Sequence, residues 1–495
     1  MNKPFFDISK EIANDFLQSI IFIDDNAYIE KVGNPRDFDA LEISKYFSLS
    51  EKFCSIFRPT KEEDIDYIIK IAKKADVVIV DWEMNFTQEL IADDQDDEVS
   101  VDDTDVRGSH TKKILKELLS DPENGKNSLK LMIIYTGTLD LPGITNEIKQ
   151  HLEADNFINL NSQRADKNCC LFTENIRIQV VYKGDPENPI FTHNPELKEQ
   201  EVTIANLPNF VLTEFTKLTN GLLSNFALKA LTEIRRNSHR ILSLFSKDID
   251  SAYLAHQSLL PNVDDSNELL VELIKDTIRD LLRNEKLNKF IDENFIKSWI
   301  SANISTVEKP CLNGDGSPLP GKNFTRNNIL LQKLLFSKNP DIEERYEDVF
   351  EDAHLTQQLS NKEKPKHIKS IIKNNIELFM PEGISEQETI NQKFAILTHH
   401  KNFFSPILQP PTLSLGTVVH STSGNYYICI QQRCDSMRIS TIRRFLFLSL
   451  TVVDGAKNFD FITPSGIKLK LDKKSYEGVR QYQHLLVCGL HRQVH

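Results

Sequence analysis

The sequence predicts a doubly wound α/β fold for about the first 190 of its 495 residues. Segments of helical period there alternate with five short apolar runs: QSIIFI (18–23), KFCSIF (52–57), DVVIV (76–80), LKLMIIY (129–135) and IRIQVVY (176–182). Each run is too short and too apolar for a surface strand. Buried strands that alternate with helices are typical of βαβ units around a parallel sheet.

Two of the connecting segments have the apolar spacing of crossover helices. KEEDIDYIIKIAKKA (61–75) places four isoleucines on one face, and HTKKILKELLS (110–120) follows the third strand at some distance. Before that second helix, eleven acidic residues and no Lys or Arg lie between Asp81 and Asp105. We therefore expect a mobile, solvated acidic insertion at about 88–105.

The rest of the chain predicts an α-helical domain (206–400) and a small, mostly β C-terminal domain (405–475). Apolar residues recur at three- and four-residue spacing from about residue 206 to residue 300. The segment CLNGDGSPLPGKNF (311–324) is rich in Gly, Pro and Asn, so we expect a loop. Farther along, two β-rich runs flank Ser423-Gly424-Asn425, which predicts a hairpin.

Composition limits the class of protein. The formal net charge of −13 argues against a chain that coats nucleic acid through its overall field. No apolar stretch reaches the roughly 18 to 20 residues that cross a bilayer, and no signal peptide is visible. We expect a cytoplasmic protein without a membrane partner. The seven cysteines include no C-x-x-C pair, which predicts reduced thiols.

Polar side chains follow four of the predicted strands at the point where each strand ends. Asp24 and Asp25 follow the first strand, Asp81 the third, Thr136 and Gly137 the fourth, and Lys183 the fifth. Ligands of doubly wound sheets bind at the carboxyl ends of the strands, near the point where strand order reverses. We therefore expect these residues to gather in one acidic pocket centred on Asp81.

The chemistry of such a pocket follows from its charge. Three carboxylates repel one another, so we expect a compensating cation, and oxygen ligands favour Mg²⁺. With the ion held by Asp24 and Asp25, Asp81 would attack a phosphoryl donor and form an acyl phosphate. Lys183 would pair with Asp81 in the empty site and with a phosphoryl oxygen in the filled one, while the Thr136 hydroxyl would donate to another oxygen. Gly137 leaves room for that oxygen.

This pattern resembles the signature of response-regulator receiver domains. The run Asp81-Trp82-Glu83-Met84-Asn85 is similar to the D-x-x-M-P run of that family, with Asn85 in place of the proline. The resemblance implies a CheY-like (flavodoxin-like) fold, with the following roles: Asp81 as phospho-acceptor, Asp24, Asp25 and Asp81 as metal ligands, Glu83 as the residue whose carbonyl completes the metal site, and Thr136 and Lys183 as the phosphoryl-sensing pair.

Two features depart from the receiver pattern. The proline that usually follows the lysine is absent, because Lys183 is followed by Gly184. Val180 stands where receivers commonly place a switch aromatic, with Tyr182 two positions later. The predicted receiver fold is therefore better supported than phosphorylation-driven switching.

More closely, the chain resembles long proteins described as carrying a response receiver domain, which are encoded in bacterial conflict and phage-defence neighbourhoods beside a histidine-kinase-like ATPase. The tail segments LSLGTVVHSTSGNYYICIQQRCDSMRI (413–439) and RRFLFLSL (443–450) belong to this resemblance. It implies a two-component or phosphorelay protein in antiviral defence, with that ATPase as partner. We expect a phosphoryl acceptor rather than a multiple-turnover enzyme.

Two alternatives stay open. The receiver-like domain would dock the ATPase without being phosphorylated, or it would gate a C-terminal effector with nucleic-acid-binding or unrecognised enzymatic activity. Basic residues that could meet a phosphate backbone lie on a predicted helix (Arg235, Arg236, His239, Arg240) and on predicted strands (Arg433, Arg438, Arg443, Arg444). Because no aromatics are interleaved with them, a solvated face is the favoured interpretation, and a homo-oligomer also stays open.

Overall fold

The computed structural model describes residues 3–29, 39–84, 86, 108–120, 129–154, 169–187, 189–194, 197–260, 264–352, 359–382, 387–399, 413, 415–431, 443–453, 459–463, 465–471 and 483–487. The chain divides into two compact units. Unit 1 comprises residues 1–249 and 272–302, and unit 2 comprises residues 250–271 and 303–495. The predicted acidic insertion at 88–105 lies outside the described residues.

Unit 1 is built on a seven-stranded sheet that contains all five predicted strands. These are β1 (Ser19–Ile23), β2 (Phe53–Phe57), β3 (Val77–Val80), β4 (Lys130–Thr136) and β6 (Ile176–Lys183), parallel and in the order β2-β1-β3-β4-β6. Two short strands also pair with β6: β5 (Cys170–Phe172) antiparallel and β7 (Glu201–Val202) parallel. Strand order reverses at β1, as in flavodoxin-like sheets, so the topology fits the predicted CheY-like fold.

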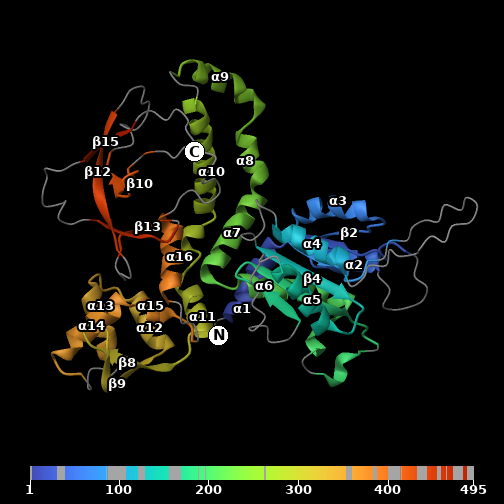
Figure 1. Ribbon diagram of the computed structural model, residues 1–495, viewed down its shortest axis with the longest axis horizontal. Helices are drawn as coiled ribbons and strands as arrows, with labels where there is room; N and C mark the ends of the chain where they lie inside the picture. Colours follow the sequence, from blue (N-terminus) through green and yellow to red (C-terminus); the bar gives the residue numbers. More distant parts are fainter. Residues whose placement is uncertain are drawn as a thin grey trace, which may run out of the picture. The chain divides into compact units, whose positions relative to one another are not determined.

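Helices cover both faces of this sheet (Figure 1), because successive side chains of each strand point to opposite faces. On one face, α3 (Glu62–Ala72), α4 (Ser109–Ser120) and α5 (Leu141–Glu153) share a core with Val78 and Val80. Helices α3 and α4 match the predicted crossover helices. Helix α5 was not predicted.

The opposite face is covered by helices from both ends of unit 1. They are α1 (Phe5–Phe16), α2 (Ala40–Leu49), α6 (Leu207–Thr219), α7 (Leu222–Arg236) and α11 (Glu293–Asn303). Neither α1 nor α2 was predicted. Helices α6 and α7 follow the predicted domain boundary at residue 206, yet they share one core with the sheet through side chains such as Val211 and Phe215.

The remaining helices between residues 190 and 300 complete the helical pattern that the sequence predicts. They are α8 (Ser238–Leu244), α9 (Asp250–Ser258), α10 (Asp264–Asn284) and the 3₁₀ turns at 191–193, 198–200, 204–206, 247–249 and 287–289. Part of the basic helix surface is used inside unit 1. Arg235 donates to the Phe16 carbonyl and lies 3.4 Å from Asp76, and Arg236 lies 3.3 Å from Asp15.

In unit 2, the prediction of a loop at 311–324 is wrong. This segment belongs to the antiparallel hairpin of β8 (Val307–Leu312) and β9 (Pro318–Arg326). The turn itself spans only the residues between them, where the Asn313 amide donates to the Ser317 carbonyl at 2.7 Å. The described residues that follow form the helices α12 (Asn328–Phe336), α13 (Ile342–Asp352), α14 (Glu363–Lys373), α15 (Ile376–Phe379) and α16 (Gln387–His399).

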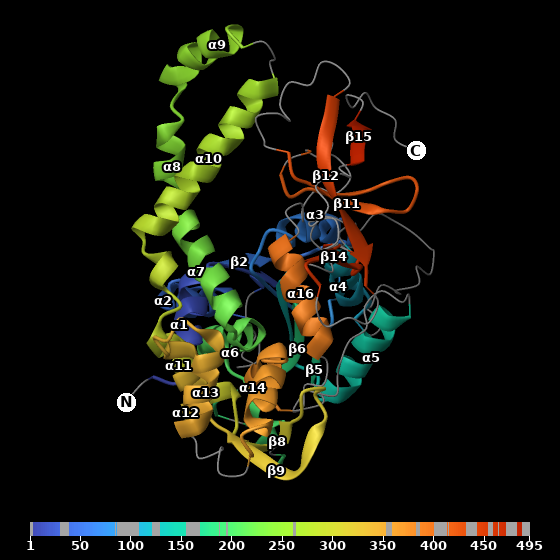
Figure 2. The same cartoon turned by 90° about the vertical axis from the view of Figure 1, so that its left-hand side faces the viewer.

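The C-terminal part of unit 2 is a six-stranded antiparallel sheet, drawn in orange and red in Figure 2. Its strands are β10 (Val418–His420), β11 (Tyr426–Cys429), β12 (Arg443–Val452), β13 (Phe461–Ile462), β14 (Lys468–Leu471) and β15 (Gln483–Val487). Strands β10 and β11 form the hairpin predicted around Ser423-Gly424-Asn425. Arg433 and Arg438 lie outside the described residues. Among the helices that the structure describes, none is long and apolar enough to cross a membrane.

Candidate functional site

The candidate site lies where strand order reverses in the sheet of unit 1. Strands β1 and β3 are adjacent and parallel, with Ile23 paired to Val80, so the residues after them emerge at one edge. The backbone ladder continues one step past the strand ends. The Asp81 amide donates to the Ile23 carbonyl at 2.9 Å, and the Asp24 amide donates to the Phe57 carbonyl at 3.1 Å. Regular strand pairing therefore fixes the backbone of both aspartates.

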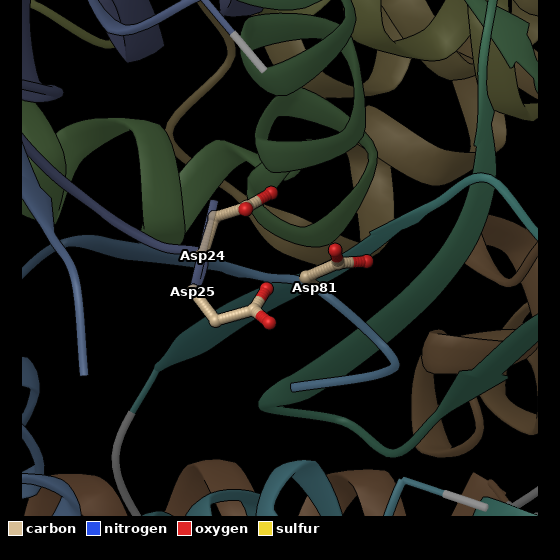
Figure 3. A group of neighbouring side chains, drawn as sticks. All are labelled: Asp24, Asp25 and Asp81. Carbon is tan, nitrogen blue, oxygen red and sulfur yellow. The ribbon is translucent and has the colours of Figure 1, made fainter. Parts of the chain in front are cut away.

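Three carboxylates form an acidic cluster at this edge (Figure 3). Asp24, Asp25 and Asp81 each offer one oxygen within 4.8 Å of the others. All three are buried, with exposed fractions of 0%, 7% and 6%. The sequence predicted this convergence of Asp24, Asp25 and Asp81, and the structure brings the three residues together.

Lys183, from the end of β6, supplies the compensating positive charge. Its Nζ lies 2.9 Å from Asp24 Oδ2 and 2.8 Å from Asp81 Oδ2. Three carboxylates facing one ammonium carry an excess of negative charge when all are ionised. The contact of Lys183 with Asp81 is the one that the sequence predicted, and the contact with Asp24 was not predicted.

Burial and crowding set the protonation of the pair. Burial raises the pKa of Asp81 to about 7, since the attraction of Lys183 offsets only part of the desolvation and Asp24 and Asp25 repel a further charge. Burial alone would lower the pKa of Lys183, but the charges of Asp81 and Asp24 raise it above its ordinary value. At neutral pH Lys183 is charged, and Asp81 holds a proton only weakly.

Backbone donors hold the carboxylates in place without using all of their lone pairs. Asp24 Oδ1 accepts from the Asn26 amide at 2.8 Å, and Asp81 Oδ1 accepts from the Trp82 amide at 2.8 Å. The Asp25 carbonyl accepts from Arg58 Nε at 3.0 Å. An all-oxygen set of donors, buried and with excess negative charge, has the chemistry that Mg²⁺ requires. The residues present therefore fit this ion.

Thr136 and Gly137 lie at the same edge, at the end of the neighbouring strand β4. Thr136 is almost completely buried, and its Oγ1 accepts from the Thr138 amide at 3.1 Å, which leaves the O–H bond able to donate. A Cβ added to Gly137 would meet nothing within 4 Å. The space beside Gly137 is therefore open, as the sequence predicted for a bound oxygen.

Glu83 follows Asp81 by two residues, and its side chain lies away from the acidic cluster. The side chain is exposed, and Glu83 Oε1 accepts from Thr138 Oγ1 at 3.4 Å. The role predicted for Glu83 belongs to its backbone carbonyl and stays a prediction. Asn85 lies outside the described residues.

Sequence reasoning missed two residues that shape the backbone around Asp81. Thr111, at the start of α4, donates through Oγ1 to the Asp81 carbonyl at 2.6 Å. Gly108 has a φ of +67°, and a Cβ there would lie 2.7 Å from the Trp82 ring. A glycine just before a helix that follows a strand was the available signal, but nothing in the sequence shows that α4 returns to Asp81.

Tyr135 and Tyr182, which directly precede Thr136 and Lys183, are both buried. Tyr182 packs edge-on against Phe191, with ring centroids 5.4 Å apart, and Val180 is also buried. Tyr135 precedes Thr136 and donates through its hydroxyl to the Val202 carbonyl at 2.9 Å. A second donor, the Gly184 amide, reaches the same carbonyl at 2.9 Å. Residues next to Thr136 and Lys183 thus share one acceptor on β7.

A comparison with protein families assigns this region. Residues 16–188 match the family model described as the response receiver domain, and the match spans β1 to β6. The receiver part of the predicted resemblance is confirmed. Receiver domains act in signal transduction through a phospho-acceptor and bind Mg²⁺ at an acidic Asp cluster. No curated protein and no solved structure matches the chain.

Proposed function

We propose, from the premise that residues 16–188 are a receiver domain, that this protein takes a phosphoryl group on Asp81 and passes the change to its helical and β-rich regions. The observation that carries the proposal is the bridge of Lys183 to Asp24 and Asp81, at 2.9 and 2.8 Å. A cation that holds the attacking carboxylate in an empty site is positioned to hold the phosphoryl oxygens in a filled one.

The phosphoryl transfer needs only the groups of the pocket and of the phosphoryl donor. A carboxylate oxygen of Asp81 attacks the phosphorus of a phosphohistidine whose ring carries a proton on its other nitrogen. The P–O bond of an acyl phosphate forms, the P–N bond breaks, and the imidazole leaves as a neutral ring. When bound between the carboxylates of Asp24, Asp25 and Asp81, Mg²⁺ would lower the repulsion between the anionic donor and this site. Lys183 Nζ and the Thr136 hydroxyl then donate to oxygens of the new phosphoryl group.

The proposed donor is a histidine-kinase-like ATPase, and the proposed setting is bacterial antiviral defence in the cytoplasm. Both rest on the resemblance of the whole chain. An Asp81 pKa near 7 is compatible with such a reaction, since a bound divalent cation would expel a weakly held proton and leave the nucleophile ionised.

A short structural path, one strand pairing and then a few residues of continuous chain, supports transfer of the signal from Lys183 to the helices. Lys183 pairs with Val202 in the sheet, and the turn 204–206 then leads directly into α6. A change in the partner of Lys183 would act on this strand, and the Tyr135 hydroxyl ties the same strand to β4. The linkage between two strand ends and one helix start is the kind of element that a switch can bias.

The deciding experiment uses the full chain with Mg²⁺ and phosphoramidate, followed by intact mass. We expect the mass to rise by one phosphoryl group, and this group should be lost again at alkaline pH. EDTA added before the reaction should prevent the gain. Asp81→Asn should not gain it. Asp66→Asn is the matched control, because Asp66 is an exposed aspartate of α3 that lies 3.3 Å from Lys113. Equal phosphorylation of the Asp81→Asn protein would contradict the proposal.

Failure of the wild-type chain to gain any phosphoryl group would favour docking without phosphorylation. In that case the ATPase should still bind the full chain, and binding should be the same for wild type and Asp81→Asn. Loss of binding in Asp81→Asn together with no phosphoryl gain would leave neither form of the receiver proposal standing.

A further inference from the structure

The first turn of α4 holds the two residues that follow β3. Thr111 Oγ1 donates to the Asp81 carbonyl at 2.6 Å and lies 3.2 Å from the Trp82 carbonyl. Successive carbonyls of an extended strand point in opposite directions, so two carbonyls that converge on one hydroxyl mark a sharp turn of the chain. Thr111 is completely buried, and water therefore cannot replace its hydroxyl as the donor.

The peptide unit between Asp81 and Trp82 connects this contact to the Asp81 side chain. A trans peptide unit is planar, and its C=O and N–H point in opposite directions. Thr111 binds the carbonyl of this unit, and the amide of the same unit donates to Asp81 Oδ1 at 2.8 Å. Because the unit is rigid, a donor that fixes the carbonyl also fixes the direction of the Trp82 amide.

The Asp81 carboxylate is consequently held at both of its oxygens. Oδ1 accepts from the Trp82 amide, and Oδ2 lies 2.8 Å from Lys183 Nζ. In the proposed reaction Lys183 exchanges this partner for phosphoryl oxygens, whereas the amide belongs to the backbone beside Asp81 and stays. The amide therefore keeps the nucleophile oriented during the attack. Such orientation lowers the barrier because the reacting atoms are already aligned.

The ring of Trp82 is held by the same helical turn, through contacts that do not involve Thr111. The Lys112 amide donates to the Gly108 carbonyl at 2.9 Å, so the helical turn begins at Gly108. A Cβ on Gly108 would lie 2.7 Å from the Trp82 ring, and Lys112 Nζ lies 5.2 Å from the ring centroid. These contacts keep α4 beside Trp82 when the Thr111 hydroxyl is removed. Its removal should then change the orientation of the peptide unit rather than the place of the helix.

We propose that Thr111 is a positioning residue for phosphoryl transfer, whose hydroxyl orients the peptide unit between Asp81 and Trp82 and through it the attacking carboxylate. This inference rests on the proposed function, since the reaction it serves is the phosphorylation of Asp81. It adds a residue of α4 to a site otherwise built from the ends of strands.

The first test measures the rate at which the full chain gains a phosphoryl group from phosphoramidate in the presence of Mg²⁺. Thr111→Val keeps the size of the side chain, and Thr111→Ala adds no methyl group beside the carbonyls. Both remove the hydroxyl, so we expect a maximal rate about tenfold lower in each. Thr111→Ser retains the donor and should keep at least about half of the wild-type rate.

Thr145→Val is the matched control. Thr145 is a buried threonine of α5, and its Oγ1 donates to the Leu141 carbonyl at 2.8 Å. The variant loses the same kind of bond within unit 1 and should react like wild type. A wild-type rate in both Thr111→Val and Thr111→Ala would overturn the proposal. So would a Thr145→Val protein as slow as Thr111→Val, because the loss of rate would then follow from a lost buried hydroxyl anywhere in the domain.

The second test needs neither a phosphoryl donor nor a metal. Hydrogen exchange of the Trp82 amide, isolated from overlapping fragments of the full chain, should be about tenfold faster in Thr111→Val and unchanged in Thr145→Val. This measurement separates the inference from the function on which it rests. If the wild type gains no phosphoryl group, the proposed function fails, and faster exchange in Thr111→Val would still support the positioning of the peptide unit by Thr111. Unchanged exchange of the Trp82 amide in Thr111→Val would overturn the inference in either case.

Discussion

Two of the buried polar centres in the described part of the chain, one in each unit, differ in how their polar groups are satisfied. In unit 1, Lys183 bridges Asp24 and Asp81, so the buried carboxylates have a partner of opposite charge from another strand. In unit 2, His367 has a backbone partner for Nδ1 and none among the described residues for Nε2. A paired buried charge can be broken only at high cost, whereas a buried neutral ring with one unmade hydrogen bond carries a smaller cost of its own.

The largest change in stability should follow removal of Lys183, the cation that bridges Asp24 and Asp81. Lys183→Ala leaves Asp24 and Asp81 buried without a counter-charge, so we expect a loss of about 3–5 kcal/mol in the stability of unit 1. The measurement is the urea midpoint of the transition that fluorescence of the two tryptophans, Trp82 and Trp299, reports, since both lie in unit 1. Mg²⁺ should restore part of the loss, because the ion would replace the missing positive charge.

A matched lysine controls for the change of side chain. Lys113 forms ion pairs with Glu62 and Asp66 on the exposed surface of unit 1, and Lys113→Ala should cost only about 0–1 kcal/mol. Similar losses for the two variants would show that the buried bridge is not what stabilises the site. A loss in Lys183→Ala that Mg²⁺ does not reduce would argue against a metal at the carboxylates.

The next largest loss of stability should come from a substitution at Gly108, whose backbone lies against the ring of Trp82, the residue after Asp81. Gly108→Ala combines a left-handed backbone, at about 1–2 kcal/mol, with a Cβ that lies 2.7 Å from the Trp82 ring and forces repacking at about 1–3 kcal/mol. Gly321→Ala in unit 2 is the matched control, since Gly321 has a φ of +68° and open space where the Cβ would lie. The difference between the two variants in thermal or urea unfolding measures the steric part alone.

The acidic cluster and its strands could be predicted because the information is local. Strands β1, β3 and β4 are short apolar runs, and their last residues are followed at once by Asp24, Asp81 and Gly137. Parallel pairing then brings the strand ends to one edge, whatever the connecting loops do. The same argument could not find Thr111, whose contact with Asp81 depends on how a connection of about thirty residues closes.

The hairpin β8–β9 could not be predicted because its composition resembles that of a loop. Prolines stand in both strands, at Pro310 and Pro318, and proline cannot donate to a strand ladder. A two-stranded sheet tolerates them because each strand has a free edge, and the pairing shifts register between Pro310 and Leu312. The hydrogen bonding of His367 also depends on this hairpin, since the donor to Nδ1 is the Leu312 amide, 55 residues earlier in the chain.

A fall in pH should raise the stability of unit 1 through Asp81 and lower the stability of unit 2 through His367. The pKa of Asp81 is raised from 3.8 to about 7 in the folded state, so its contribution to stability is present below pH 3.8 and is lost as the pH rises towards 7. The pKa of His367 is lowered from 6.5 to about 4, so its contribution is present above pH 6.5 and is lost as the pH falls towards 4. Between pH 6.5 and about 4.5, unit 1 should gain stability from Asp81 while unit 2 loses it, each by at most about 1.4 kcal/mol per pH unit.

Urea unfolding followed by hydrogen exchange, in the absence of divalent cations, would resolve the two units across this pH range. Asp81→Asn should remove the dependence in unit 1 alone, and His367→Asn should remove it in unit 2 alone. If the stabilities of both units changed with pH in the same direction, in the wild type and in either variant, neither Asp81 nor His367 would be the source of the pH dependence.

The smallest expected effect concerns the link between the site and the helices. Tyr135→Phe removes the hydroxyl that donates to the Val202 carbonyl and keeps the ring that packs edge-on against Phe22, 5.9 Å away. The carbonyl retains its bond from the Gly184 amide, so the loss of stability in unit 1 should be only about 0.5–1.5 kcal/mol.

Phosphorylation of Asp81 should be unchanged in Tyr135→Phe, because Tyr135 does not contact the carboxylates through its hydroxyl. Hydrogen exchange in α6 should respond to phosphoramidate in the wild type and respond less in Tyr135→Phe. An unchanged response of α6 in the variant would place the transfer of the signal elsewhere than on this strand.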